Sequence, residues 1–117
     1  MKIKEISYLD PIEDAENDCL DVRVTLENND YYYVEVATPK FFYTLMKRFN
    51  RNFLPPYFPY IIVEKLTNKI IRDAIQEYID ADEDAYWLKL YHVAATLEIK
   101  DLNQILEQKK KENAELD

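Results

Sequence analysis

The chain has 117 residues, of which 48% are hydrophobic and 32% charged, and this suits one compact domain, residues 1–117, with a buried core. It contains no glycine, so phosphate-binding loops, dinucleotide-binding turns and nucleophile elbows that require glycine are excluded. One cysteine and one histidine exclude an intramolecular disulfide and zinc sites built from several such residues. The sequence therefore predicts no metal site, no cofactor and no catalytic centre.

The charge is −8 in total but is unevenly distributed along the chain, at −6 for residues 1–30, +4 for 31–75 and −6 for 76–117. Such a field repels nucleic acid phosphates and favours a basic protein partner. The most acidic stretch has no positive residue before Arg23 and contains Asp10, Glu13, Asp14, Glu16, Asp18 and Asp21. No apolar run has the length of a signal peptide core or a membrane span, so we expect a cytoplasmic protein without membrane contact.

A short first strand is expected over residues 2–8, followed by the acidic loop. Residues 20–27 alternate strictly between apolar and polar side chains. After the turn Asn28-Asn29-Asp30, residues 31–37 place Tyr32, Val34 and Val36 on one face and Tyr31, Tyr33 and Glu35 on the other. These two segments predict an antiparallel hairpin over residues 19–37. A buried strand over residues 60–64 is expected to join its sheet, which gives an antiparallel sheet of three to four strands.

Four helices are predicted, over residues 39–50, 67–80, 83–95 and 101–110. Thr38-Pro39 starts the first, because the hydroxyl can cap a free N–H and proline suits the first helical position. Thr67 caps the second helix, whose apolar residues form an uninterrupted stripe. From about residue 108 we expect a charged, frayed tail. Strands followed mainly by helices predict a single α+β domain.

Three groups of residues resemble chemical sites, but for each of them a structural role explains the sequence better than a chemical one. Asp80 to Asp84 resembles the start of a calcium loop, but its sixth position is Ala85 and its twelfth is Tyr91, so these acids are better explained as helix caps. His92 is the sole histidine and is expected at a packing boundary. Cys19 lies close to acidic residues, which disfavour its thiolate.

Two aromatic segments are candidates for binding a partner. Alternation places Tyr31 and Tyr33 on the sheet face opposite Tyr32, where they are exposed together if helices cover one face alone. Residues 53–60 read Phe-Leu-Pro-Pro-Tyr-Phe-Pro-Tyr, and their rings either cover the sheet edge or fill the core, or present Tyr57 and Phe58 to a partner. A proline-rich segment suits the second role because it loses little entropy on binding.

In its small size, acidity and tyrosine-rich segments the chain resembles immunity proteins that mask basic toxin nucleases, a functional class that spans many folds. The resemblance implies a non-catalytic module that binds and neutralises a basic toxin or effector. In this interpretation the acidic stretch from Asp10 to Asp21 steers the partner, and Tyr31, Tyr33, Tyr57 and Phe58 anchor it. The alternatives are a homo-oligomeric or complex-forming subunit and, third, a small enzyme based on His92 and scattered carboxylates.

Overall fold

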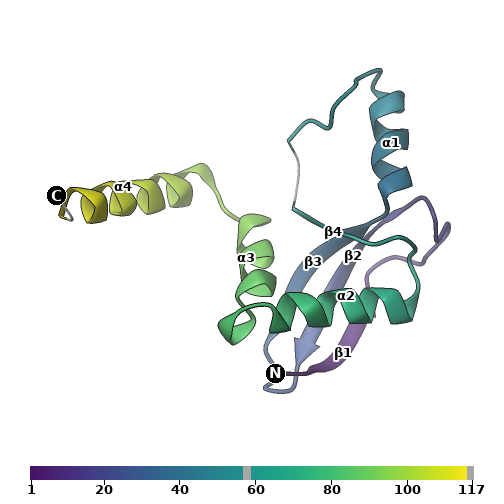
Figure 1. Cartoon of the computed structure of the whole chain (residues 1–117), viewed down its shortest axis with the longest axis horizontal. Coiled ribbons are helices and arrows are strands. Elements are labelled where there is room, and N and C mark those ends of the chain that lie inside the picture. Colours follow the sequence, from purple (N-terminus) through teal and green to yellow (C-terminus); the bar gives the residue numbers. More distant parts are fainter. Residues whose placement is uncertain (57–58, 116–117) are drawn as a thin grey trace.

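The computed structural model of the chain describes residues 1–56 and 59–115, and these form an α+β domain with a four-stranded sheet in the order β1-β2-β3-β4 (Figure 1). The strands are β1 (Ile3–Tyr8), β2 (Cys19–Leu26), β3 (Tyr31–Ala37) and β4 (Tyr60–Ile62). The helices are α1 (Pro39–Arg48), α2 (Asn68–Asp80), α3 (Tyr86–Ala94) and α4 (Ile99–Glu115), with a 3₁₀ turn, η1 (Glu83–Ala85), before α3. The predicted fold class is confirmed.

The predicted hairpin is confirmed, with Val22 opposite Val34 and Asp21 opposite Glu35 in an antiparallel ladder. β1 adds to β2 in antiparallel sense, with one irregularity between Ile3 and Glu5. The prediction of an all-antiparallel sheet needs one correction, because β4 runs parallel to β3. The chain leaves β3, passes through α1 and a long loop, and returns before β4 begins, which is the crossover that parallel neighbours require. β4 ends at Ile62, two residues earlier than predicted.

The core lies between one face of the sheet and α2, which crosses that face in Figure 1. The period-2 pattern of β2 and β3 supplies one layer of apolar side chains, and the helical stripe of α2 supplies the other. The central core side chains are fully buried: Leu20, Val22, Val24, Val36, Ile61, Ile71, Ile75 and Leu88. The opposite face, which carries the polar members of the alternation, stays partly accessible. This open face of the sheet is where the candidate site lies.

α1 begins as predicted, since the Thr38 side chain accepts a hydrogen bond from the Phe41 N–H and proline occupies the first position. It ends at Arg48 rather than at residue 50, because the chain turns through Asn50 at a positive φ of 51°. Asparagine tolerates this left-handed conformation better than most residues. The turn directs the following residues back toward the sheet, where Leu54 and Pro55 lie over its open face.

α3 begins three residues later than predicted. Asp84 and Ala85 both adopt left-handed backbone angles, with φ of 54° and 55°, and these separate the 3₁₀ turn from α3. Ala85 is nearly fully buried, so packing holds an alanine in a conformation that costs it about 1 kcal/mol. The resulting bend places α3 beside β3 and beside the end of α2 (Figure 1).

α4 is longer than the predicted helix and continues to Glu115, through the segment expected to be a charged tail. It extends away from the sheet and has no buried residue (Figure 1). Its apolar residues Ile99, Leu102, Ile105 and Leu106 are exposed. No helix within the described ranges, 1–56 and 59–115, is long and apolar enough to cross a membrane.

Candidate functional site

The acidic loop joins β1 to β2 and is anchored to the domain at several points. The Leu66 N–H donates to the Ala15 carbonyl at 2.7 Å, and Lys65 pairs with Glu16 at 3.4 Å. The Asp14 carboxylate accepts from the Glu16 N–H at 3.0 Å. Asp10, Glu13, Asp14 and Glu16 are exposed, so the loop presents a fixed negative surface at one end of the sheet.

The last two acids of the stretch have different surroundings. Asp18 is half-buried, and its carboxylate accepts from the Cys19 N–H at 2.8 Å. Asp21 lies on β2, on the open face of the sheet, directly opposite Glu35 of β3. Asp18 therefore stabilises the start of β2, whereas Asp21 extends the negative surface of the loop onto the sheet.

Tyr31 and Tyr33 are both exposed on the open face, at 57% and 40% of their surface. Their rings meet edge to face with centroids 5.9 Å apart, and the Arg23 guanidinium lies 6.0 Å from the Tyr31 centroid. Tyr33 borders a hollow of about 260 Å³ together with Leu9, Asp21 and Glu35. Tyr31 lies at the other end of β3 from the acidic loop, roughly 20 Å along the strand. Predicted anchors Tyr57 and Phe58 lie outside the described residues.

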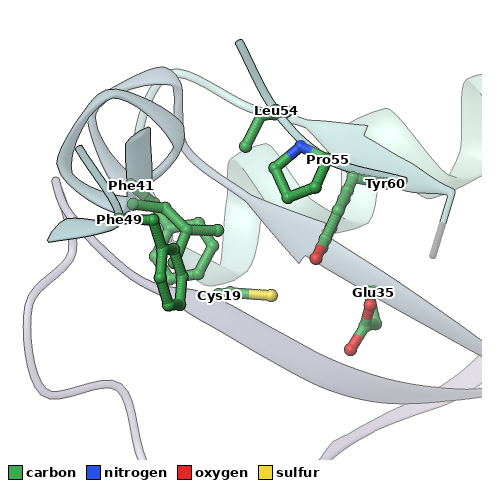
Figure 2. Close-up of a pocket in the computed structure, with 8 residues that line it drawn as sticks. Cys19, Glu35, Phe41, Phe49, Leu54, Pro55 and Tyr60 are labelled. Atoms are coloured by element: carbon green, nitrogen blue, oxygen red, sulfur yellow. The ribbon is translucent and has the colours of Figure 1, made fainter. Parts of the chain in front are cut away.

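A larger hollow of about 510 Å³ lies where α1 and the loop after it pass over the open face. Figure 2 shows Cys19, Glu35 and Tyr60 of the sheet on one side and Phe41, Phe49, Leu54 and Pro55 on the others. Leu45 of α1 completes the lining. The Tyr60 ring packs edge to face on Phe42 with centroids 4.9 Å apart, which fixes one wall. We call this hollow the sheet cavity.

Glu35 is the charged group that lines both hollows. Burial raises the pKa of its carboxyl from 4.5 to about 7, and a hydrogen bond with Asp21 and the charge of Asp21 add to the rise. The Glu35 Oε2 atom is buried and has no hydrogen-bond partner within the described chain. Nor does any lysine or arginine of residues 1–56 and 59–115 form an ion pair with Asp21 or Glu35. Glu35 is thus a partly desolvated acid that lies beside the exposed Asp21, and neither residue is paired with a cation in the described ranges.

Cys19 faces the same cavity, and its thiol is kept protonated. Burial raises the pKa of Cys19 to about 12, and the charges of Glu35, Asp21 and Asp18 add to this effect. The predicted suppression of the thiolate by Asp18 and Asp21 is confirmed, with burial as the larger cause. Cys19 therefore serves as a small apolar wall of the cavity rather than as a nucleophile.

His92 closes an edge of the sheet. β4 pairs with residues 35–37 of β3, and α3 lies beside the remaining part of that strand. The Tyr33 backbone N–H donates to His92 Nδ1 at 2.9 Å, and the His92 ring stacks on Tyr33 with centroids 6.1 Å apart. This contact satisfies a donor that would otherwise be free at a strand edge. The structure thus gives His92 a packing role, as its position in the sequence suggested.

Sequence reasoning named Asp21, Tyr31 and Tyr33, which the structure places on the open face, but it named neither Glu35 nor the sheet cavity as a candidate. Alternation places Asp21 and Glu35 on the same face of the hairpin, but their direct opposition depends on a turn over residues 27–29, in which the Leu26 N–H donates to the Asp30 carbonyl, rather than on the predicted turn Asn28-Asn29-Asp30. Two like charges directly opposite each other in a sheet are unfavourable, so such a pair merits attention in a sequence. The cavity itself depends on the path of residues 49–56, which no local pattern specifies.

Within the part of the chain that the structure describes, no cluster of three or more histidine, cysteine or acidic side chains could hold a metal ion. Comparisons with family models, with curated proteins and with solved structures each gave no match to this chain.

Proposed function

We propose that the protein is a non-catalytic module that binds a basic protein partner through the open face of its sheet. The supporting observation is that this face carries exposed Tyr31 and Tyr33 together with Asp21 and Glu35, two acids that form no ion pair with any described lysine or arginine. Exposed tyrosines supply apolar contact area and a hydroxyl, and unpaired acids select a cationic surface. The most concrete form is an immunity-type protein that masks a basic toxin or effector.

The anchored acidic loop gives this surface a long-range component. Its exposed carboxylates lie at the end of the sheet next to Asp21, so the negative potential is continuous from the loop onto the face. Charges at the rim of an interface mainly accelerate association and make it depend on salt, whereas central aromatic residues slow dissociation. The two groups of residues therefore have separate kinetic signatures.

The first test is capture from the native host's lysate at low and high salt, followed by rate measurements on the purified partner. Glu13→Lys with Asp14→Lys is expected to slow association about tenfold at low salt with little change in dissociation. The matched control is Asp73→Lys with Glu77→Lys, which makes the same charge change on α2, at the opposite face. Equal effects of the two double variants, or an association rate that does not depend on salt, would contradict the proposal.

The aromatic contribution is tested with Tyr31→Ser and Tyr33→Ser, which we expect to speed dissociation. A suitable control is Tyr43→Ser, since Tyr43 of α1 is equally exposed at 57% but lies off the open face. If dissociation changes as much for Tyr43→Ser as for Tyr31→Ser, the open face is not the binding surface.

Self-association is the second candidate, and the exposed apolar stripe of α4 favours it. Ile99 is 71% exposed, and Leu102, Ile105 and Leu106 follow at helical spacing on a helix without a buried residue. A single helix of this length gains little stability in water unless its apolar face is covered. Sedimentation equilibrium of the full chain and of a chain ending at residue 98 separates the two functions: a monomer at all micromolar concentrations refutes self-association.

A further inference from the structure

The sheet cavity has the features of a binding site for a cation on an apolar stem. Its volume of about 510 Å³ falls in the range of cavities that enclose small organic groups. Its walls are mainly the rings and aliphatic side chains of α1 and the loop after it, and its floor carries the Glu35 carboxyl (Figure 2). One end of an occupant is thus provided with hydrocarbon contacts and the other with a carboxylate.

The Glu35 carboxyl is the feature that selects the charge of the occupant. Its Oε2 atom is buried without a hydrogen-bond partner in the described chain, and a buried acceptor without a donor is costly. Asp21 on the neighbouring strand adds a second negative group. An ammonium or guanidinium donates several hydrogen bonds and no neutral apolar ligand does, so a cation beside the Glu35 carboxyl in the cavity compensates its desolvation and offsets the repulsion between Glu35 and Asp21.

We propose that the sheet cavity binds a primary ammonium or guanidinium group on an apolar stem, supplied as a lysine or arginine side chain of the basic partner. This inference rests on the proposed function and names the contact at its centre. The methylene stem of such a side chain packs on Phe41, Leu45 and Phe49, while its charged end reaches Glu35. A lysine or arginine seated there becomes a desolvated anchor of the interface.

Proton exchange gives the site a second signature. The Glu35 carboxyl has a raised pKa, so it is partly protonated at neutral pH when the cavity is empty. A bound cation favours the state in which both Glu35 and Asp21 are ionised. The proton leaves to solvent, and affinity therefore rises with pH through about 7. The other titratable groups that line the two hollows around Glu35 are Cys19, Asp21, Tyr33, Tyr60 and Tyr91.

The direct test uses hexylammonium as probe on the full chain, followed by NMR titration and calorimetry at pH 8, with hexanol and hexanoate as matched neutral and anionic probes. We expect hexylammonium to shift the amide signals of Cys19, Glu35 and Tyr60. Glu35→Gln is expected to weaken its binding about tenfold, and Glu77→Gln on α2 to leave it unchanged. Hexanol binding as tightly as hexylammonium, or Glu35→Gln binding like wild type, would overturn the inference.

A second variant and a second probe complete the test. Leu45→Trp fills the cavity and is expected to abolish hexylammonium binding. If Leu45→Trp fails to fold, the loss of hexylammonium affinity in Glu35→Gln tests the inference. Nα-acetyl-lysine methylamide distinguishes the source of the cation: binding of hexylammonium without binding of this compound would refute a protein side chain as the ligand. A basic partner that binds Leu45→Trp as tightly as wild type would overturn this inference while leaving the proposed function intact. If the probe binds but no basic partner is captured, the proposed function and the assignment of the cation to a partner side chain are both refuted, and the cavity is a site for a free organic cation.

Discussion

Replacing Glu35 by glutamine should make the protein more stable at alkaline pH. In the folded chain the pKa of Glu35 is about 7, because burial and then Asp21 disfavour its ionised form, against an ordinary value of 4.5. The folded state therefore holds a proton that the unfolded state has lost between these two pKa values. Stability falls as pH rises through this interval, the full penalty is present above pH 7, and none remains below about pH 4.5.

The magnitude follows from the same two values. One pKa unit corresponds to about 1.4 kcal/mol, so the rise corresponds to about 3 kcal/mol before solvent screening. Because the Glu35 side chain is only partly buried, we reduce this by about half, to between 1 and 2 kcal/mol. For a domain of this size that is an increase of roughly 5 °C in melting temperature at pH 8.

Thermal and urea unfolding from pH 4 to pH 8 measure the effect. The free energies of unfolding of Glu35→Gln and wild type should coincide near pH 4 and diverge as the pH rises, with the variant becoming the more stable protein. Glu13→Gln, which removes the same charge from an exposed position, should follow wild type throughout. Parallel curves for Glu35→Gln and wild type across the whole range would refute the assignment of a raised pKa to this carboxyl.

Three further predictions concern the rest of the fold. Thr38→Ala should lower the free energy of unfolding in urea by about 2 kcal/mol, because the buried Thr38 hydroxyl accepts from two backbone N–H groups. Thr67→Ala, at the exposed cap of α2, should lower it by about 1 kcal/mol. Equal losses for the two variants would contradict the role of burial. His92→Leu should accelerate hydrogen exchange at the Tyr33 amide, and unchanged exchange would show that His92 does not protect it. Deleting residues 99–117 should leave the melting temperature within about 2 °C at low concentration, because α4 has no buried residue; a large fall would show that α4 supports the core.

Local patterns predict most of the elements because each depends on neighbours in sequence. The strict alternation over residues 20–27 specifies both β2 and the face it buries, and Thr38-Pro39 specifies the start of α1 through a cap and a fixed φ. The turn between β2 and β3 uses Asn29 at a φ of 71°, one of the asparagines suited to that task in a chain without glycine.

The features that the sequence did not predict depend on distant contacts. The direction of β4, a three-residue strand, depends on where the loop before it returns to the sheet. Ala85 adopts a left-handed conformation that alanine disfavours, because its burial between helices outweighs the local cost. The length of α4, in contrast, follows from local propensity, since its lysines, glutamates and leucines are good helix formers. It was missed because the charge of this segment was interpreted as a sign of fraying.

The sheet cavity depends both on a local sequence pattern and on contacts between segments that are distant in the sequence. Alternation places Glu35 on the polar face of β3, where an acid is ordinary, but α1 and the loop after it then enclose that position. The resulting desolvation lowers the stability of the folded state and prepares a site for a cation, so one substitution has two opposite effects. Glu35→Gln should raise the free energy of unfolding at pH 8 and lower the affinity for hexylammonium at the same pH. A gain in stability without a loss of affinity would separate the two effects, and the acid pair would then be a local cost unconnected with binding.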